Sequence, residues 1–144
     1  MASSTEDIAE QLRQAVGRLV RTTRAHADTL PGTHAETLGY LSREGPHTIA
    51  ELAALRRVKH QSMSRTVGEL VTAGFVTRAA NPADARSFVI MLTAEGATAL
   101  DADRAARQQW VAARIATTLT PAEQDLLAQV PALLDRLSHD PSTD

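Results

Sequence analysis

Apolar residues recur at helical spacing along most of this chain and alternate with polar residues only between Phe75 and Leu92. Apolar residues at helical spacing indicate an amphipathic helix, and alternation of apolar and polar residues indicates a half-buried strand. We therefore expect helices over residues 6–28, 33–43, 48–55, 59–73, 93–118 and 120–137. The alternating runs predict two strands, 75–78 and 87–92, and the Asn-Pro-Ala-Asp segment at 81–84 predicts a turn between them.

Capping residues mark several of these helix starts. A Thr followed three residues later by Glu can cover the free N–H groups of a first turn, and this spacing occurs at Thr33, Thr48 and Thr120. Thr93 is a near match, because its Glu comes one position early. Pro131 lies inside the predicted 120–137 helix and removes a backbone hydrogen bond, so we expect a kink or a local break there.

The predicted first and last helices both carry wide apolar stripes. One holds Ile8, Leu12, Val16, Leu19 and Val20, and the other holds Leu126, Leu127, Val130, Leu133, Leu134 and Leu137. A small hairpin-bearing lobe offers too little surface to cover both stripes. A second copy of the chain is the expected partner. The alternative is that these helices only cap their own domain.

The amino-acid composition limits the possible fold classes and the expected cellular compartment. In 144 residues, 43% are apolar and only 3% are aromatic, which favours packed helices in a single domain of the mainly α (α+β) class. The chain has no cysteine, which excludes disulfides and thiolate chemistry. It begins without a signal-peptide pattern and has no apolar run near the roughly 20 residues of a membrane span. We expect a soluble, cytoplasmic protein with no membrane partner.

Positive charge is concentrated in one segment, although the net charge of the chain is −2. Six basic residues fall between positions 56 and 86 against two acidic ones, Glu69 and Asp84. The rest of the chain therefore carries a net charge of −6. A local basic patch on an acidic body is typical of phosphate binding, although a solvated surface can have the same pattern.

The 59–73 helix is predicted to be a DNA recognition helix. Met63, Val67, Leu70 and Val71 fall on one face and should pack inward. The opposite face is short, polar and basic, with Lys59, Gln61, Ser62, Ser64, Arg65 and Gly68. Short side chains permit close approach to a major groove, where Gln, Ser and Arg can bond to base edges. The alternative is an ordinary solvated face, which more often alternates Glu and Lys.

The hairpin adds two arginines beside this helix. Arg78 lies at its start and Arg86 on its far side, next to Asp84 at the tip. An arginine at a hairpin tip can enter a narrow minor groove, where the potential is most negative. We expect Asp84 to steady the loop and the Arg86 side chain.

These segments together resemble the MarR family of transcriptional regulators. The most specific pieces are Leu-x-x-x-Gly-Phe-Val-x-Arg over 70–78, Asp84-x-Arg86, and Leu92-Thr-x-x-Gly96. The resemblance implies one MarR-like domain over 1–144, with a winged helix-turn-helix lobe at 33–93 and a helical dimerisation region at 1–32 and 94–144. It further implies an obligate triangular dimer, a sequence-specific regulator on a pseudo-palindromic operator, and in many members repression released by a small aromatic or phenolic ligand.

Carried over by position, the resemblance assigns DNA contacts to this chain. Gln61, Ser62, Ser64 and Arg65 would face the major groove, with Lys59 and His60 near the backbone. The 79–87 wing would place Arg86 in the minor groove, although Ala79, Ala80 and Ala85 stand where charge could be. Oxidant-sensing members use a cysteine, so that branch is excluded here.

Other chemistry has little support in the sequence. The five histidines show no paired metal-ligand spacing, and no nucleophile elbow or glycine-rich phosphate loop occurs, so we expect no enzyme, metal or cofactor. An effector pocket could use His26, Tyr40 and Trp110, but packing roles are favoured for Tyr40 and Trp110. Two alternatives remain: a winged-helix module for protein–protein assembly, and a regulator without an effector.

Overall fold

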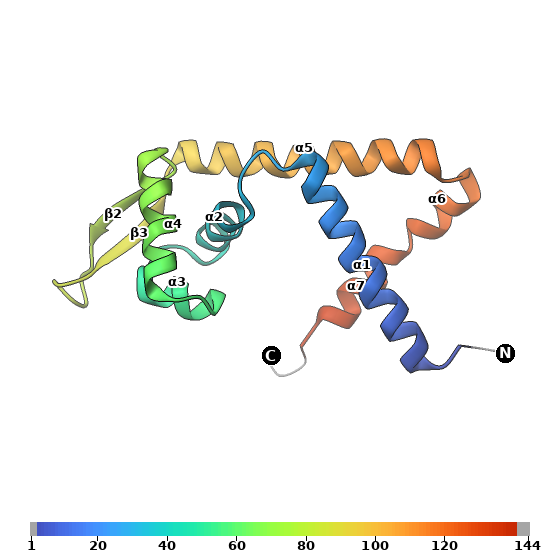
Figure 1. Cartoon of the computed structure of the whole chain (residues 1–144), viewed down its shortest axis with the longest axis horizontal. Helices are drawn as coiled ribbons and strands as arrows, with labels where there is room; N and C mark the ends of the chain where they lie inside the picture. The colour runs from blue at the N-terminus through green and yellow to red at the C-terminus, as the bar shows by residue number, and fades with distance from the viewer. Residues whose placement is uncertain (1–2, 141–144) are drawn as a thin grey trace. The chain divides into compact units, whose positions relative to one another are not determined.

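A computed structural model describes residues 3–140 as helices and a small antiparallel sheet (Figure 1). The helices are α1 (Thr5–Ala27), α2 (Gly32–Glu44), α3 (Ile49–Arg56), α4 (His60–Thr72), α5 (Ala94–Thr118), α6 (Pro121–Leu127) and α7 (Val130–Ser138). The strands are β1 (His47–Thr48), β2 (Val76–Ala80) and β3 (Phe88–Leu92). The mainly helical class with a winged hairpin is confirmed. None of the described helices is long and apolar enough to cross a membrane.

The chain divides between Arg107 and Gln108 into two compact units. The first contains α1 to α4, the sheet and the first half of α5. The second contains the rest of α5 with α6 and α7. The division into a DNA-binding lobe at 33–93 and a dimerisation region at 1–32 and 94–144 stays a prediction.

The core of the first unit forms where α2, α3, α4 and the hairpin meet. Met63, Val67 and Leu70 of α4 are buried together, as their helical spacing predicts. They pack with Leu38, Leu41, Leu52, Ala53, Val76, Ile90 and Leu100. Val71 was expected to join them, but it is 36% exposed. That prediction was wrong because Val71 follows Leu70 directly and so turns off the buried face.

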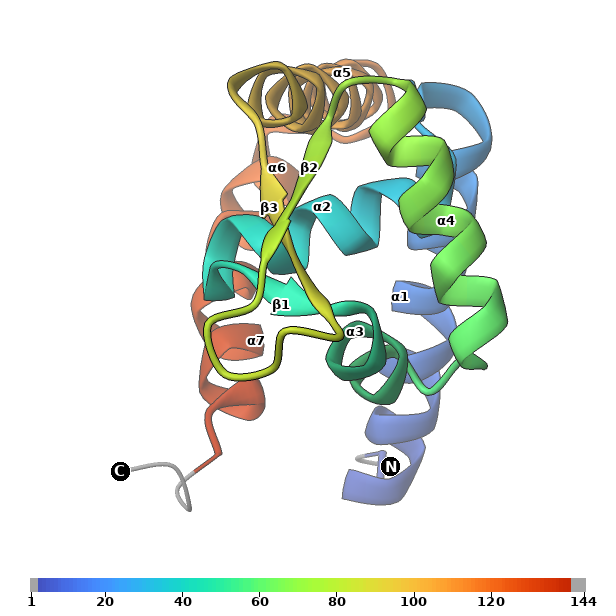
Figure 2. The same cartoon turned by 90° about the vertical axis from the view of Figure 1, so that its left-hand side faces the viewer.

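The sheet has one more strand than the alternating pattern predicts. β3 lies between β2 and β1 and pairs antiparallel with both, with Val76 opposite Leu92 and Ala80 opposite Phe88 (Figure 2). The additional strand, β1, pairs only His47 with Ile90 and Thr48 with Val89. Two residues are too few to show alternation in a sequence, so this strand could not be predicted.

The helix caps confirm most of the predicted starts. Thr48 and Thr120 accept hydrogen bonds from the N–H groups of Glu51 and Glu123 at 3.1 and 3.2 Å. Thr33 was predicted as a cap, but α2 begins one residue earlier, at Gly32, and its N-cap Pro31 makes no side-chain capping bond. The hydroxyl of Thr33 therefore falls inside the first turn.

The predicted 120–137 helix is two helices. α6 ends at Leu127 and α7 begins at Val130, with Pro131 in its first turn. Pro131 has no N–H to donate, and the start of a helix is where a missing donor costs least. The expected kink or break is therefore a break.

Candidate nucleic-acid interface

Helix α4 presents the predicted contact residues on its exposed side. Lys59, His60, Gln61, Ser62 and Arg65 are exposed and Ser64 is half-buried. The apolar residues that hold the helix in place are buried on the other side. The core thus fixes the orientation of this face and leaves its polar side chains exposed.

The first turn of α4 leaves its backbone N–H groups without a side-chain cap. Lys59 is the N-cap residue and makes no capping bond, and no residue of this turn is acidic. A helix N-terminus carries a partial positive charge, which Lys59 reinforces. This end of α4 is suited to an anion such as a DNA phosphate.

Arg65 is not isolated on the surface of α4. Its Nε lies 3.2 Å from Oε1 of Glu69, one turn along the helix, and Oε2 of Glu69 lies 2.7 Å from Nε2 of His34 on α2. The hydrogen bond from His34 lowers the pKa of Glu69 against the raising effect of burial, and Arg65 lowers it further. The sequence gives no sign of the His34 contact, because the two residues are 35 positions apart.

The wing loop is organised by two polar side chains, Asn81 and Asp84. Oδ1 of Asn81 accepts the N–H of Ala83 at 3.0 Å, and Nδ2 of Asn81 donates to the hydroxyl of Ser87 at 2.9 Å. Oδ1 of Asp84 accepts the N–H of Arg86 at 3.0 Å and lies 3.6 Å from its Nε. Asp84 thus contacts both the backbone and the side chain of Arg86, and its role as a support of the wing in DNA binding stays a prediction.

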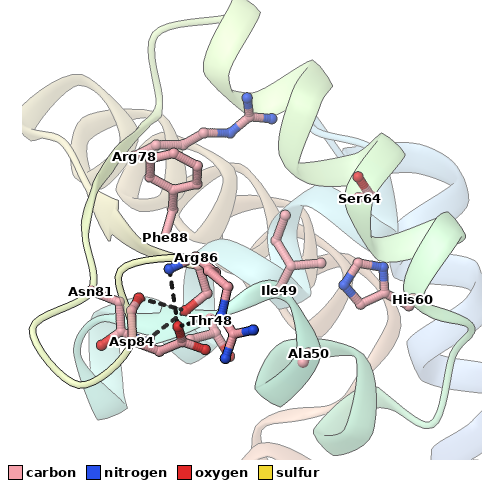
Figure 3. Close-up of a pocket in the computed structure, with 11 residues that line it drawn as sticks. Thr48, Ile49, Ala50, His60, Ser64, Arg78, Asn81, Asp84, Arg86 and Phe88 are labelled. Carbon is pink, nitrogen blue, oxygen red and sulfur yellow. Dashed lines mark hydrogen bonds and ion pairs between the residues drawn. The ribbon is translucent and has the colours of Figure 1, made fainter.

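The wing and α4 border a common hollow. Its lining includes His60 and Ser64 of α4, Arg78 of β2, and Arg86 and Phe88 across the wing. Figure 3 shows His60 and Ser64 on one side of this hollow and Arg78 and Arg86 on the other. The arginine side chain at the tip is 94% exposed. The fold thus brings His60, Ser64, Arg78 and Arg86 together around one hollow of the first unit. The other predicted contacts, Lys59, Gln61, Ser62 and Arg65, are not part of its lining.

One basic residue in the turn before α4 was not among the predicted contacts. Arg57 lies in the turn between α3 and α4 and has a φ of 51°, the only positive φ of a non-glycine residue in the part of the chain that the structure describes. A side chain in this left-handed region is strained. The sequence could have pointed to Arg57, because a basic residue stands there at the end of a helix, where glycine is common.

The three effector candidates contact different neighbours. The Tyr40 ring meets His47 edge-on, with ring centroids 5.1 Å apart. Nδ1 of His26 lies 2.8 Å from the carbonyl oxygen of Thr22 on the same helix. Trp110 belongs to the second unit, where the guanidinium carbon of Arg114 lies 5.9 Å from its ring centroid. In the described residues no cluster of three or more His, Cys, Asp or Glu could hold a metal ion.

A helix-turn-helix followed by a hairpin, with an exposed basic face on its second helix, is the architecture of a DNA-binding regulator. The MarR family model matches residues 28–87. An HTH-type transcriptional regulator of Mycobacterium bovis is 36% identical over 93% of this chain and 94% of its own length. A similar regulator of Mycobacterium leprae is 33% identical over the same shares.

Solved structures agree with this assignment. A transcriptional regulator from Pseudomonas aeruginosa superimposes with a TM-score of 0.78 at 31% identity, over 96% of this chain and 99% of that one. The apo form of MarR from E. coli has a TM-score of 0.68 at 21% identity, over 96% and 100%, which is a likeness of fold. The chain belongs to the MarR family. It is a helix-turn-helix transcriptional regulator and not an enzyme.

Proposed function

We propose that this regulator is a cytoplasmic homodimeric repressor that binds a pseudo-palindromic operator. In each half-site, α4 would enter the major groove and the 79–87 wing the adjacent minor groove. The observation that carries the proposal is the common face formed by α4 and the wing. On that face, basic side chains surround a hollow that contains small polar residues.

The chemistry of α4 supports base readout. Gln61, Ser62 and Ser64 are short enough for the helix backbone to approach base edges, and Arg65 can bond to guanine or phosphate. In the free protein Arg65 is paired with Glu69. Binding would exchange that exposed ion pair, which is worth little in water, for a contact with DNA.

A small aromatic or phenolic effector that releases DNA is part of the proposal. Its candidate contacts are His26 and Tyr40 in the first unit and, separately, Trp110 in the second unit. The competing function is a winged-helix module that binds another protein and leaves its basic face solvated. The two are separated by duplex binding at several salt concentrations, because phosphate contacts make affinity fall steeply with salt.

Substitution of Arg65 by Ala tests the placement of α4. We expect strongly weakened operator binding with an unchanged fold, since the side chain is 84% exposed. If Arg65 bonds to a guanine, discrimination at one base pair should relax by about 1–3 kcal/mol. If Arg65 bonds to phosphate, affinity should fall equally for all DNA sequences. The slope of log affinity against log salt concentration should then decrease in magnitude by about one. Fluorescence anisotropy with operator and random duplexes measures both.

The matched control is Arg13→Ala. Arg13 is likewise exposed on a helix and is paired with Glu10 on its own helix, but it lies on α1. The control should bind the operator as the wild type does. Unchanged binding by the Arg65 variant would refute the placement of α4 in the groove.

The wing is tested by Arg86→Ala and Asp84→Ala on the same operator at two salt concentrations. The Arg86 variant should lose affinity with little change in major-groove preference, because minor-groove readout separates mainly A·T from G·C. The Asp84 variant should show a milder loss, since its bond to the Arg86 N–H holds the loop. An acid beside phosphate is otherwise unfavourable, so tighter binding by Asp84→Ala would contradict its support role.

A further inference from the structure

The carboxylate of Glu69 lies between two helices and is shared by two donors. Glu69 is the one acidic residue of α4. Its Oε1 accepts a hydrogen bond from Nε of Arg65 at 3.2 Å, and its Oε2 lies 2.7 Å from Nε2 of His34 on α2. An ionised carboxylate can only accept, so the imidazole donates in this contact. Each oxygen of Glu69 therefore has its own partner.

His34 holds this carboxylate more firmly than Arg65 does. The His34 side chain is 14% exposed, whereas that of Arg65 is 84% exposed. The core joins α2 to α4, and in it Leu38 and Val67 are both fully buried. A bond to a covered donor costs less side-chain entropy than a bond to an exposed arginine. The hydrogen bond from His34 is also the largest cause of the lowered pKa of Glu69.

The pair between Arg65 and Glu69 has a single hydrogen bond, whereas a comparable pair on α1 has two. There, both oxygens of Glu10 accept from Arg13, from Nε at 3.0 Å and from Nη2 at 2.7 Å. Two parallel bonds are the strong form of an arginine–carboxylate pair. At Glu69 one oxygen is taken by His34. Among the residues that the structure describes, the Nη groups of Arg65 have no hydrogen-bond partner. Such groups can bond to O6 and N7 of a guanine.

We propose that His34 is a positioning residue for DNA recognition. By binding Oε2 of Glu69, it prevents this carboxylate from closing on Arg65 with both oxygens, so that Arg65 can exchange its weak partner for DNA. Without His34, Glu69 turns both oxygens to Arg65 and competes with DNA for it. This role rests on the proposed function, in which Arg65 leaves Glu69 on binding. His34 acts through Glu69 and not through a DNA contact of its own.

The test is a double-mutant cycle on operator binding, measured by fluorescence anisotropy at one pH and one salt concentration. His34→Ala should bind the operator about two- to five-fold more weakly, which is the range expected when a stronger exposed ion pair must be broken. Glu69→Gln should bind tighter by a similar factor, because the competing charge is gone. In the Glu69→Gln protein, His34→Ala should have no further effect, since no carboxylate is left to position.

His34→Gln separates this role from simple packing. The glutamine amide can replace the N–H donor of the imidazole, so this variant should restore binding close to that of the wild type. Glu10→Gln is the matched control, because it removes the charge from the other exposed glutamate–arginine pair, on α1. The control should bind the operator as the wild type does. Thermal unfolding of each variant checks that the fold is intact.

Three results would each overturn this role of His34. They are equal operator binding by His34→Ala and the wild type, a loss by His34→Ala that persists in the Glu69→Gln protein, and no tightening by Glu69→Gln. In each case, weakened binding by Arg65→Ala would show that the proposed function stands. A wild type that does not bind the operator would overturn both.

Discussion

At the scale of single residues, Asp103 is the most deeply placed charge that the structure describes. It is fully buried on α5, and its Oδ1 accepts the N–H groups of Thr29 and Leu30 at 2.8 and 3.1 Å. Oδ2 lies 3.1 Å from Arg107, in ion-pair contact without hydrogen-bond alignment. Burial raises the pKa of Asp103, but the Thr29 and Leu30 donors and Arg107 together lower it below its ordinary value.

This lowered pKa makes stability depend on pH. Because the folded pKa is depressed, the contribution is complete above the ordinary Asp pKa of about 3.9 and is lost as pH falls through the folded value. Asp103→Asn should therefore cost about 1–3 kcal/mol at neutral pH and less in acid. Urea unfolding at about pH 7 and about pH 3 measures the difference.

Asp101→Asn is the control for this prediction, since Asp101 is exposed on the same helix. It should leave stability almost unchanged at both pH values. An equal loss of stability by Asp103→Asn at the two pH values would show that its charge is not what stabilises the turn.

Local residue patterns were predictable, and contacts between distant segments were not. The Thr48 and Thr120 caps lie three residues from their partners, so the sequence displays both members of each pair. Asp103 is 74 residues from Thr29, and nothing in either neighbourhood identifies the other. In the candidate site, helical spacing likewise placed the polar face of α4. It could not reveal that Glu69 joins Arg65 to His34.

At the scale of elements, a short hydrogen-bonded clasp joins the turn at Gly74 and Phe75, which follows α4, to the start of α5. The hydroxyl of Thr93 donates to the carbonyl oxygen of Gly74 at 2.7 Å and accepts the N–H of Gly96 at 3.0 Å. The N–H of Thr93 donates to the carbonyl oxygen of Phe75 at 3.0 Å. Gly96 packs so closely that a Cβ would overlap that carbonyl oxygen. The Leu-Thr-x-x-Gly motif therefore has a steric reason.

Gly96→Ala should destabilise the protein by about 1–3 kcal/mol, because backbone must move to admit the methyl group. Gly68→Ala is the matched control, since a Cβ there meets nothing within 4 Å. Alanine is the better helix former, so the control should gain up to about 1 kcal/mol. Thermal unfolding of both variants measures whether each substitution lowers or raises the stability of the protein. A stable Gly96→Ala protein would contradict the clasp.

Element types were predicted well wherever the hydrophobic period ran over several turns, as in α1, α4 and α5. The predictions failed where the deciding contact was short or came from elsewhere in the fold. β1 exists through its pairing with β3 and not through any pattern of its own. A kink or break near Pro131 was foreseen because a proline lacks the N–H that the helical hydrogen-bond pattern needs.

At the scale of the whole molecule, apolar side chains are exposed on both terminal regions. On α1, Ile8 and Leu19 are 56% and 54% exposed. On α6 and α7, Leu126, Leu133 and Leu137 are 66%, 52% and 73% exposed. Single exposed leucines are ordinary, but stripes at helical spacing on separate helices are typical of surfaces covered in an assembly. A second copy of the chain is the partner that we propose.

Sedimentation should find the wild type as a dimer at micromolar concentration. Leu133→Asp should give a monomeric or unfolded protein, because an unpaired charge is costly inside an apolar interface. Leu55→Asp is the control, since Leu55 is exposed to nearly the same extent, 51%, but lies on α3 of the first unit. That variant should remain a dimer. If the charge at Leu133 leaves the dimer intact, or if the folded wild type sediments as a monomer, the stripes are not a dimer interface, and binding to a two-fold operator would need another explanation.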